Sequence, residues 1–162
     1  MDIIAIDKSS ASDAAPLVAE FRVELKGYKG VCAKPDVAAG LSEISEYLDE
    51  GFPSYAAVED GMFVGYVVCR VDEPTVWIES IFVRGDFRRM GIASALLRKA
   101  ESIAGAYGEN TVFNYVHPNN DRMIAFLRRH GYTVLNLIEI RKPYPDEKPV
   151  KRIKVGENEF DY

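Results

Sequence analysis

The chain has 162 residues, which at roughly 150 residues per domain predicts one domain, or one domain with an appendage. Hydrophobic residues make up 48% of the sequence and charged residues 28%, as in an ordinary globular protein. Twenty Lys and Arg against 25 Asp and Glu give a net charge of −5 and a pI near 5.1. This balance argues against a general nucleic-acid or anionic-membrane binder, because affinity for phosphate comes mainly from Lys and Arg, and it is compatible with a cationic small substrate.

The cysteines and histidines predict neither a disulfide framework nor a metal site. Cys32 and Cys69 are the only cysteines, and Cys69 ends an apolar run that predicts a core position. His117 and His130 are the only histidines, and neither has a second ligand at metal spacing. The N-terminal residues lack the features of a signal peptide, and no apolar run approaches the roughly 18 residues of a membrane span. We therefore expect a cytoplasmic protein without a metal.

The first 50 residues predict a strand followed by two helices. A short strand is expected at residues 3–6. Ser10 begins a group of N-capping residues, and apolar residues follow at helical spacing as far as Leu25. A second amphipathic helix follows Asp36 and stops at Gly51.

A meander of three strands comes next. The strand patterns at residues 54–59 and 62–71 flank Asp60-Gly61, a dipeptide that suits the type I′ turn of a hairpin. A third strand is expected at residues 75–83.

The pattern then changes to alternating helix and strand. A helix is expected between Gly91 and Gly108, a strand at residues 111–116, a short helix after Asn120 and a strand at residues 132–140. The order β-α-α-β-β-β-α-β-α-β is an α+β arrangement with a central β-α-β crossover.

The sequence leaves the structure of the C-terminal segment open. Three prolines interrupt it, and residues 151–155 alternate charged and apolar side chains. An ordered extension, an added edge strand, a segment lying across the domain and a contact with a second subunit all remain open. We expect a domain at residues 1–141 and an extension at residues 142–162.

The segment from Trp77 to Ser94 carries the densest functional signal. It predicts a strand, a compact turn with Arg88 and Arg89, and a helix that begins at Gly91. A helix N-terminus leaves N–H groups unpaired and attracts phosphate, and Gly91 allows an anion to approach the backbone. The chemistry predicts a pyrophosphate site, and the alternative is a helix N-terminus with surface arginines.

This segment resembles motif A of the GCN5-related N-acetyltransferase (GNAT) superfamily, in which a strand ending in Val precedes Arg/Gln-x-x-Gly-x-Gly/Ala. The strand at residues 78–83 is similar to that of diamine acetyltransferases. Downstream, residues 111–116, Asn120, Ala125-Phe126 and Gly131-Tyr132 resemble motif B. The resemblance implies a mostly antiparallel central sheet flanked by helices. Element order agrees over residues 3–140, and specific motifs cover about residues 77–132.

The resemblance also implies where acetyl-CoA binds. Backbone groups of Ile81 and Val83 are expected to bond the pantetheine arm in a splay between two strands, and backbone N–H groups of residues 89–94 to cradle the pyrophosphate. Asn120 is expected either to contact the cosubstrate, to cap the following helix, or to do both. The expected cosubstrate-binding residues are Ile81, Phe82, Val83, Arg88, Arg89, Met90, Gly91, Ile92, Ala93, Ser94 and Asn120.

Glu79 is the candidate catalytic residue, because it interrupts an apolar strand close to the expected thioester. An amine is protonated near neutral pH, and a carboxylate is a reasonable base for its deprotonation, directly or through a water. The resemblance also allows that Glu79 binds a cationic acceptor, and the remaining alternative is a solvent-facing carboxylate. Many relatives have a Tyr acid where this chain has Leu127, and Tyr115 and Tyr132 are possible substitutes or packing residues.

Together these features predict an acetyl-CoA-dependent N-acetyltransferase that uses direct attack in a ternary complex on a small cationic amine. The alternatives are a protein or peptide N-acetyltransferase and a non-catalytic acyl-CoA sensor. We expect no nucleic-acid or membrane partner, and a homodimer through the tail remains possible.

Overall fold

The computed structural model describes residues 1–149 and 151–162. These divide into two compact units, Met1–Ala125 and Phe126–Tyr162. Each unit is described by itself. The predicted domain boundary after residue 141 stays a prediction.

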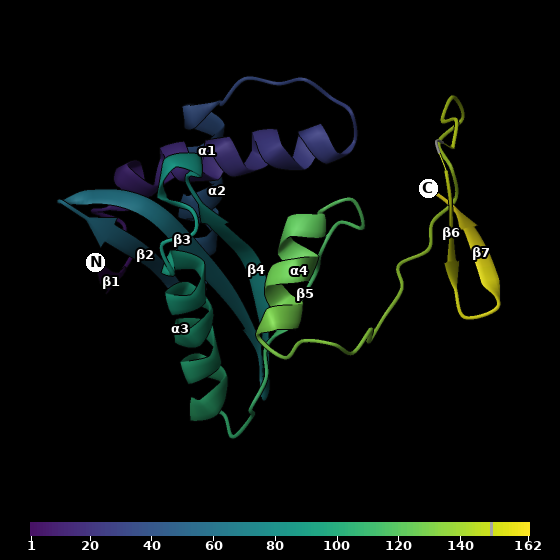
Figure 1. Cartoon of the computed structure of the whole chain (residues 1–162). Coiled ribbons are helices and arrows are strands. Elements are labelled where there is room, and N and C mark those ends of the chain that lie inside the picture. Colours follow the sequence, from purple (N-terminus) through teal and green to yellow (C-terminus); the bar gives the residue numbers. More distant parts are fainter. Residues whose placement is uncertain (150) are drawn as a thin grey trace. The chain divides into compact units, whose positions relative to one another are not determined.

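A five-stranded sheet forms the centre of the first unit, in the order β1-β2-β3-β4-β5 (Figure 1). Neighbours from β1 to β4 are antiparallel, and β5 lies parallel to β4. The strands are β1 Asp2–Ala5, β2 Ser54–Glu59, β3 Met62–Asp72, β4 Thr75–Val83 and β5 Phe113–Asn114. The predicted crossover is confirmed, because α3 (Ile92–Ala106) connects β4 to β5.

Local sequence explains where several elements begin and turn. The Asp36 carboxylate accepts a hydrogen bond from the Ala39 N–H at 3.0 Å and so caps α2 (Val37–Asp49). Asp60 and Gly61 both have positive φ, 49° and 77°, as a type I′ turn between β2 and β3 requires. The predicted meander is confirmed.

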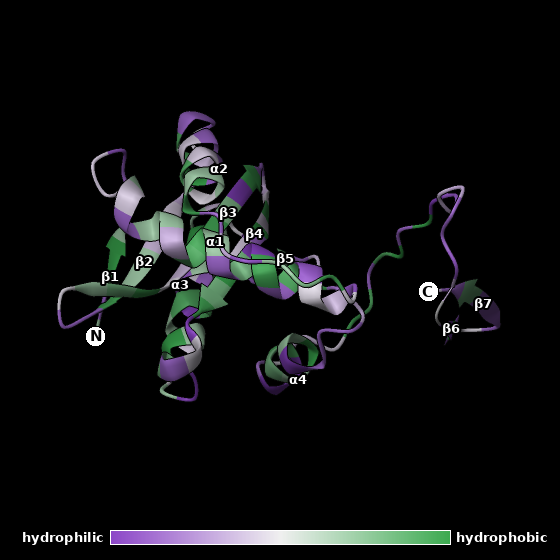
Figure 2. Ribbon diagram, turned by 90° about the horizontal axis from the view of Figure 1, so that it is seen from above, coloured by the Kyte–Doolittle hydropathy of each residue, from purple (hydrophilic) through white to green (hydrophobic). Residues whose placement is uncertain are grey.

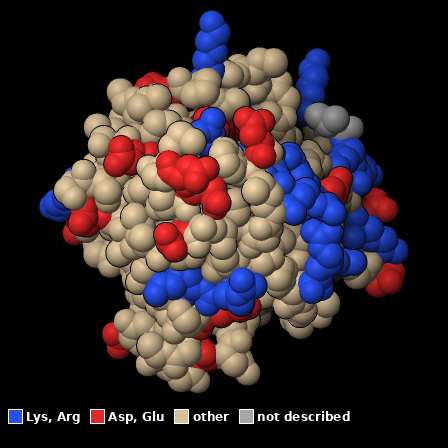
Figure 3. Space-filling model, turned by 60° about the vertical axis from the view of Figure 1, so that its left-hand side comes forward, with Lys and Arg blue, Asp and Glu red and all other residues tan. Residues whose placement is uncertain are grey.

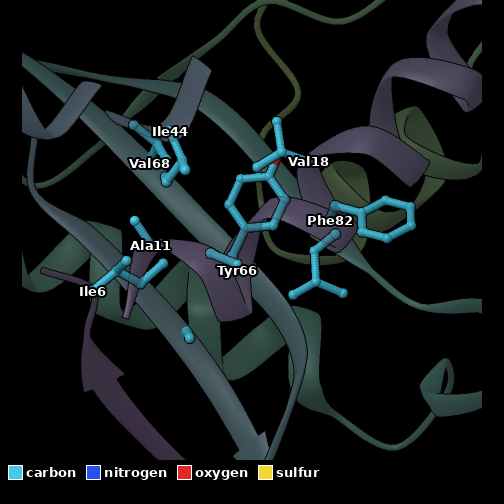
Figure 4. Close-up of a cluster of buried hydrophobic side chains, with 10 residues drawn as sticks. Ile6, Ala11, Val18, Ile44, Tyr66, Val68 and Phe82 are labelled. Atoms are coloured by element: carbon cyan, nitrogen blue, oxygen red, sulfur yellow. The ribbon is translucent and has the colours of Figure 1, made fainter. Parts of the chain in front are cut away.

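Helices cover both faces of the sheet. Residues of α1 (Ala11–Tyr28) and α2 pack with Tyr66, Val68 and Phe82 in one apolar cluster. Figure 4 shows the Tyr66 ring of this cluster beside Val18 of α1. The opposite face meets α3, since a Cβ added at Gly65 would lie 3.3 Å from Leu96 Cδ1. Hydropathy follows this arrangement, with much of the sheet drawn as hydrophobic in Figure 2.

Charged side chains of both signs lie on the face drawn in Figure 3. The net charge of −5 therefore does not give this face a uniformly acidic surface.

Two predictions for the second half of the chain need correction. The predicted strand at residues 111–116 is reduced to Phe113–Asn114. The predicted strand at residues 132–140 is wrong, because the structure has no strand there. Alternating apolar residues favour a strand, but a strand forms only where another edge pairs with its backbone. Side chains of this segment, such as Val134 and Leu135, are exposed instead.

The second unit contains the last residues of α4 (Asp121–Arg129) and a hairpin of β6 (Arg152–Val155) and β7 (Asn158–Asp161). The tail thus adds two strands that pair with each other. A dimer contact through the tail stays a prediction.

Candidate active site

The pairing between β4 and β5 ends early. Only Trp77 with Phe113 and Ile78 with Asn114 form the parallel ladder. From Glu79 to Val83, β4 has its β3 neighbour but no β5 partner among the described residues. One backbone edge of β4 is therefore open over this stretch, as the expected splay requires.

Glu79 lies in a β-bulge at the start of this open stretch. Val68 of β3 pairs with Ser80, and the next residue, Cys69, pairs with Ile78. Glu79 is thus the extra residue of β4, and a bulge of this kind redirects a side chain and often lies beside an active site. Its side chain is 32% exposed, so the carboxylate is neither buried nor fully solvated.

Arg70 on β3 is the ion-pair partner of Glu79. Its Nε lies 3.4 Å from Glu79 Oε2, and its guanidinium also pairs with the Asp72 carboxylate. The same guanidinium lies 5.7 Å from the centre of the Trp77 ring. Tyr115, a suggested substitute acid, stacks on Trp77 with ring centres 4.8 Å apart and is 63% exposed. Its observed contact is an aromatic packing contact.

The turn between β4 and α3 presents backbone N–H groups. A short 3₁₀ helix, Gly85–Phe87, follows β4, and the next residues include Arg89 with φ 67° and Gly91 with φ 82°. Gly91 is the N-cap of α3, and as a glycine it has no side chain with which to cap the helix. A Cβ at Gly91 would meet no described atom within 4 Å. The start of α3 thus combines a helix N-terminus with open space at Gly91, as anion binding needs.

The side chains in this region have different environments. Those of Phe82 and Ile92 are buried in the core, and the backbone of Phe82 lies opposite Tyr66 of β3, so neither side chain is available to a ligand. Met90 is 60% exposed, and Ile81, Ala93 and Ser94 are half-buried.

Arg88 does not extend into solvent at the start of α3. Its Nε donates to the Val83 carbonyl at 2.8 Å, and its Nη2 donates to Glu24 Oε1 at 2.5 Å. Its guanidinium also lies 5.5 Å from the centre of the Phe82 ring. The sequence predicted a positive charge at Arg88, but it did not predict that Glu24 and the Val83 carbonyl bind this side chain.

Asn120 caps α4, as one of its two interpretations predicted. Its Oδ1 accepts a hydrogen bond from the Met123 N–H at 3.1 Å, and its carbonyl accepts from the Ile124 N–H. Its other predicted role, contact with the cosubstrate, stays a prediction. In the second unit, Leu127 is buried.

Sequence reasoning missed a polar cluster between α1 and α2. Arg22 binds Glu43 through two hydrogen bonds of 2.7 and 2.5 Å, and the Tyr47 hydroxyl donates to Glu43 Oε1 at 3.1 Å. Burial, and then the Glu43 carboxylate, raise the pKa of Tyr47, to which Glu79 also contributes. The spacing of Glu43 and Tyr47, four residues apart on one helix face, was the available signal.

Two hydroxyls of the neighbouring strands are buried close to this cluster. Tyr66 on β3 and Ser80 on β4 have no hydrogen-bond partner for their hydroxyls within the described residues. Burial raises the pKa of Tyr66, an effect that the nearby Ser80 hydroxyl opposes. The Tyr47 and Tyr66 hydroxyls therefore both stay protonated near neutral pH.

The sequence model of the acetyltransferase (GNAT) family matches residues 21–132, which is more than half of the chain. The chain belongs to the GNAT family. It is accordingly an acetyl-CoA-dependent N-acetyltransferase, and family membership leaves the acceptor open. The open β4 edge, the Glu79 bulge and the start of α3 all lie inside the matched range.

Solved structures share the GNAT fold at low sequence identity. An aminoglycoside 6′-N-acetyltransferase from Acinetobacter haemolyticus has a TM-score of 0.67 at 20% identity, covering 90% of this chain and all of its own. The aminoglycoside N-acetyltransferase AAC(6′)-Iy, bound to a CoA-containing bisubstrate analogue, has a TM-score of 0.67 at 22% identity, covering 88% and 98%. A ribosomal-protein-alanine N-acetyltransferase from Brucella melitensis biovar Abortus 2308 has a TM-score of 0.68 at 21% identity, with the same coverage.

No protein with a curated description matches the chain significantly in sequence. Among the residues that the structure describes, no helix has the length and apolar character to cross a membrane. The same residues contain no group of three or more His, Cys, Asp or Glu that could hold a metal ion.

Proposed function

We propose that this GNAT enzyme acetylates the primary amine of a small cationic acceptor by direct attack on acetyl-CoA in a ternary complex. The position of Glu79 carries the proposal. It is the bulged residue of β4, and it directly follows Ile78, the last β4 residue paired with β5. A partly exposed carboxylate is thereby available where the open edge of β4 begins.

The chain offers suitable groups for acetyl-CoA. The open edge of β4 includes Ile81 and Val83, whose backbone groups can bond the pantetheine arm as an added strand does. The backbone N–H groups of residues 89–94 can receive the pyrophosphate at the start of α3, where Gly91 leaves open space. Asn120 can contact the cosubstrate through its amide nitrogen while its Oδ1 caps α4. Acetyl-CoA supplies the activated acetyl group.

Glu79 acts as the general base in this proposal. The acceptor amine must lose a proton before its lone pair can attack the thioester carbonyl. Glu79 takes that proton directly or through one water, a contribution typically worth about 10²–10⁴-fold in rate. Arg70 holds one carboxylate oxygen of Glu79 and so limits the directions in which the carboxylate points.

Burial of Cys69 removes one candidate nucleophile for a covalent acetyl-enzyme. Burial raises the pKa of the Cys69 thiol to about 12, which leaves little of the nucleophilic thiolate near neutral pH. The leaving thiol of CoA, with an ordinary pKa of about 8.5, departs tolerably as its anion, so Leu127 in place of an acid is compatible with turnover.

Carboxylates near the bulge favour a cationic acceptor. Glu79 and Asp72 both pair with Arg70, and Glu43 accepts a hydrogen bond from the Tyr47 hydroxyl, whose pKa Glu79 also influences. Aminoglycosides, the acceptors of two structural neighbours, are polyamines of this charge type. A protein N-terminus is the second candidate, since a ribosomal-protein-alanine N-acetyltransferase is equally similar in fold.

The test measures release of the CoA thiol from acetyl-CoA with polyamines, aminoglycosides, amino acids and short peptides. Release with a cationic small amine above the acceptor-free rate supports the proposal. Acceleration by peptides alone would favour the second candidate. An absence of acceleration by every acceptor, despite acetyl-CoA binding, would contradict the small-amine assignment.

A further inference from the structure

We propose that Arg88 is a positioning residue for acetyl-CoA, held by Glu24 and by the Val83 carbonyl, and that it is not a ligand of the pyrophosphate. The inference rests on the proposed function, because it concerns how the same cosubstrate site is built. It differs from the expectation from the sequence that Arg88 and Arg89 both bind the cosubstrate at the start of α3.

The Arg88 guanidinium donates hydrogen bonds to two acceptors within the protein. Nη2 donates to Glu24 Oε1 at 2.5 Å, and Nε donates to the Val83 carbonyl at 2.8 Å. The Arg88 and Glu24 side chains are 25% and 32% exposed, so this ion pair is more protected from water than an ordinary surface pair. A planar guanidinium suits two such directed bonds, which an ammonium cannot reproduce in the same geometry.

The Val83 carbonyl faces the open edge of β4. The Arg84 N–H donates to the Val64 carbonyl, on the β3 side, at 3.0 Å. Because backbone groups of successive strand residues face opposite edges, the Val83 carbonyl is directed to the other, open edge. Arg88 therefore binds the end of the edge that is proposed to receive the pantetheine arm. It leaves the Val83 N–H and the backbone groups of Ile81, two residues earlier, for the ligand.

The same contacts constrain the turn that presents the N–H groups. Arg89, the next residue, has φ 67°, a left-handed conformation that a residue other than Gly adopts only when its surroundings impose it. The two bonds of Arg88 supply such a constraint directly before it. Holding this turn orients the N–H groups at the start of α3 before the ligand arrives.

Glu24 connects this turn to a second part of the proposed site. Arg122 at the start of α4 lies 4.0 Å from the same Glu24 oxygen, and the Asn119 amide donates to the Tyr28 carbonyl at 3.1 Å. The C-terminal part of α1 thus contacts both the turn after β4 and the loop that carries Asn120.

Glu24→Gln separates positioning from direct phosphate contact, because the two roles predict opposite signs. If Arg88 positions the turn, the loss of its carboxylate partner weakens CoA binding. If Arg88 binds the pyrophosphate, Glu24→Gln releases the guanidinium and removes a competing negative charge, so binding stays equal or tightens. Glu20→Gln, one turn earlier on α1 and without an ion pair in the described structure, controls for the general loss of a charge.

The experiment measures the Kd for CoA by calorimetry in wild type, Glu24→Gln, Arg88→Ala, Arg88→Lys and the double variant Glu24→Gln/Arg88→Ala. We expect each single variant to weaken binding by about fivefold or more, and the double variant to lose no more than Arg88→Ala, since coupled residues act through one contact. Arg88→Lys keeps the charge but not the bonds, and we expect it to fail to restore affinity. In turnover, KM for acetyl-CoA rises while kcat at saturation changes less than KM.

Pantetheine, which lacks the pyrophosphate, gives a second measurement. Constraint of the open β4 edge predicts that Arg88→Ala also weakens pantetheine binding, whereas a phosphate ligand predicts no effect on it. Full affinity in Glu24→Gln, or rescue by Arg88→Lys, would overturn the inference while leaving the proposed function intact. Wild type that binds no CoA would overturn both. Thermal melting of each variant identifies any loss of CoA binding that comes from unfolding.

Discussion

Arg70 and Glu79 form an ion pair between neighbouring strands, with Arg70 Nε 3.4 Å from Glu79 Oε2. The pair crosses the β-bulge, since Arg70 is opposite Trp77 in the β3–β4 register and Glu79 is the extra residue of β4. The proposed base is therefore held by a cation of the protein itself. A cationic acceptor that approaches Glu79 has to share or replace this partner.

Arg70→Ala tests whether that partner orients the base. Both side chains are about one-third exposed, so the pair contributes at most about 1 kcal/mol to the free energy of unfolding. We expect kcat to fall about threefold to tenfold, as for a base that loses its orientation, while stability changes little. Steady-state kinetics and urea unfolding measure the two effects. Arg98→Ala, on the exposed side of α3, is the matched control, and an equal loss of kcat there would remove Arg70 from the mechanism.

Glu79→Gln tests the proposed base itself. The amide keeps the shape of the side chain but cannot take a proton from the amine, so we expect kcat to fall at least about tenfold. The Kd for acetyl-CoA should stay within about twofold, because the proposed pantetheine and pyrophosphate contacts come from other residues. Single-turnover kinetics and calorimetry separate these values. Unchanged turnover would show that Glu79 is not the base.

Several elements of the fold follow from local sequence patterns. The Asp60-Gly61 turn, the Asp36 cap and the helix that begins after Gly91 are local features, and the structure has all three. Glu79 stood out because a carboxylate interrupts an apolar strand. The bulge that isolates Glu79 depends on the register with β3, which no local pattern determines.

The errors and omissions have a common physical origin in long-range pairing. The segment 132–140 has strand-like alternation but no paired edge. Arg88 has a partner 64 residues away in Glu24, and Arg22 has one 21 residues away in Glu43. Such pairs depend on how the helices pack on the sheet and on each other. No regular spacing in a single sequence indicates which residues they join.

Gly91→Leu tests the proposed pyrophosphate site. Gly91 has φ 82° and open space around it, so a side chain there strains the backbone and blocks the approach of an anion to the start of α3. We expect acetyl-CoA affinity to fall at least about tenfold, the loss typical of charged hydrogen bonds. Gly108→Leu, with φ 83° and equally open space after the other end of α3, introduces matched strain. Undiminished affinity by calorimetry in Gly91→Leu would contradict the assignment.

The two cysteine thiols should differ sharply in their rates of alkylation. Burial raises the pKa of Cys69 to about 12, whereas Cys32 is exposed. The thiolate is the reactive form, so at pH 8 Cys69 is almost entirely the unreactive thiol and is also shielded. We expect iodoacetamide to label one thiol per folded chain and two after unfolding in urea, as counted by mass spectrometry. Labelling of Cys69 in the folded protein at the rate of Cys32 would contradict its burial.

Gly40→Ala tests the close approach of α1 and α2, on which the Arg22–Glu43 contact depends. A Cβ at Gly40 would lie 2.4 Å from the Ala15 carbonyl oxygen and 3.1 Å from the Ala19 nitrogen, and both are backbone atoms that cannot rotate away. We expect a loss of about 1–3 kcal/mol in the free energy of unfolding, as for overpacking, despite the better helix propensity of Ala. Gly105→Ala is the control within α3, where a Cβ meets no described atom within 4 Å, and it should gain about 0.5–1 kcal/mol. Urea unfolding measures both changes, and a gain in Gly40→Ala would mean that the two helices separate at no cost.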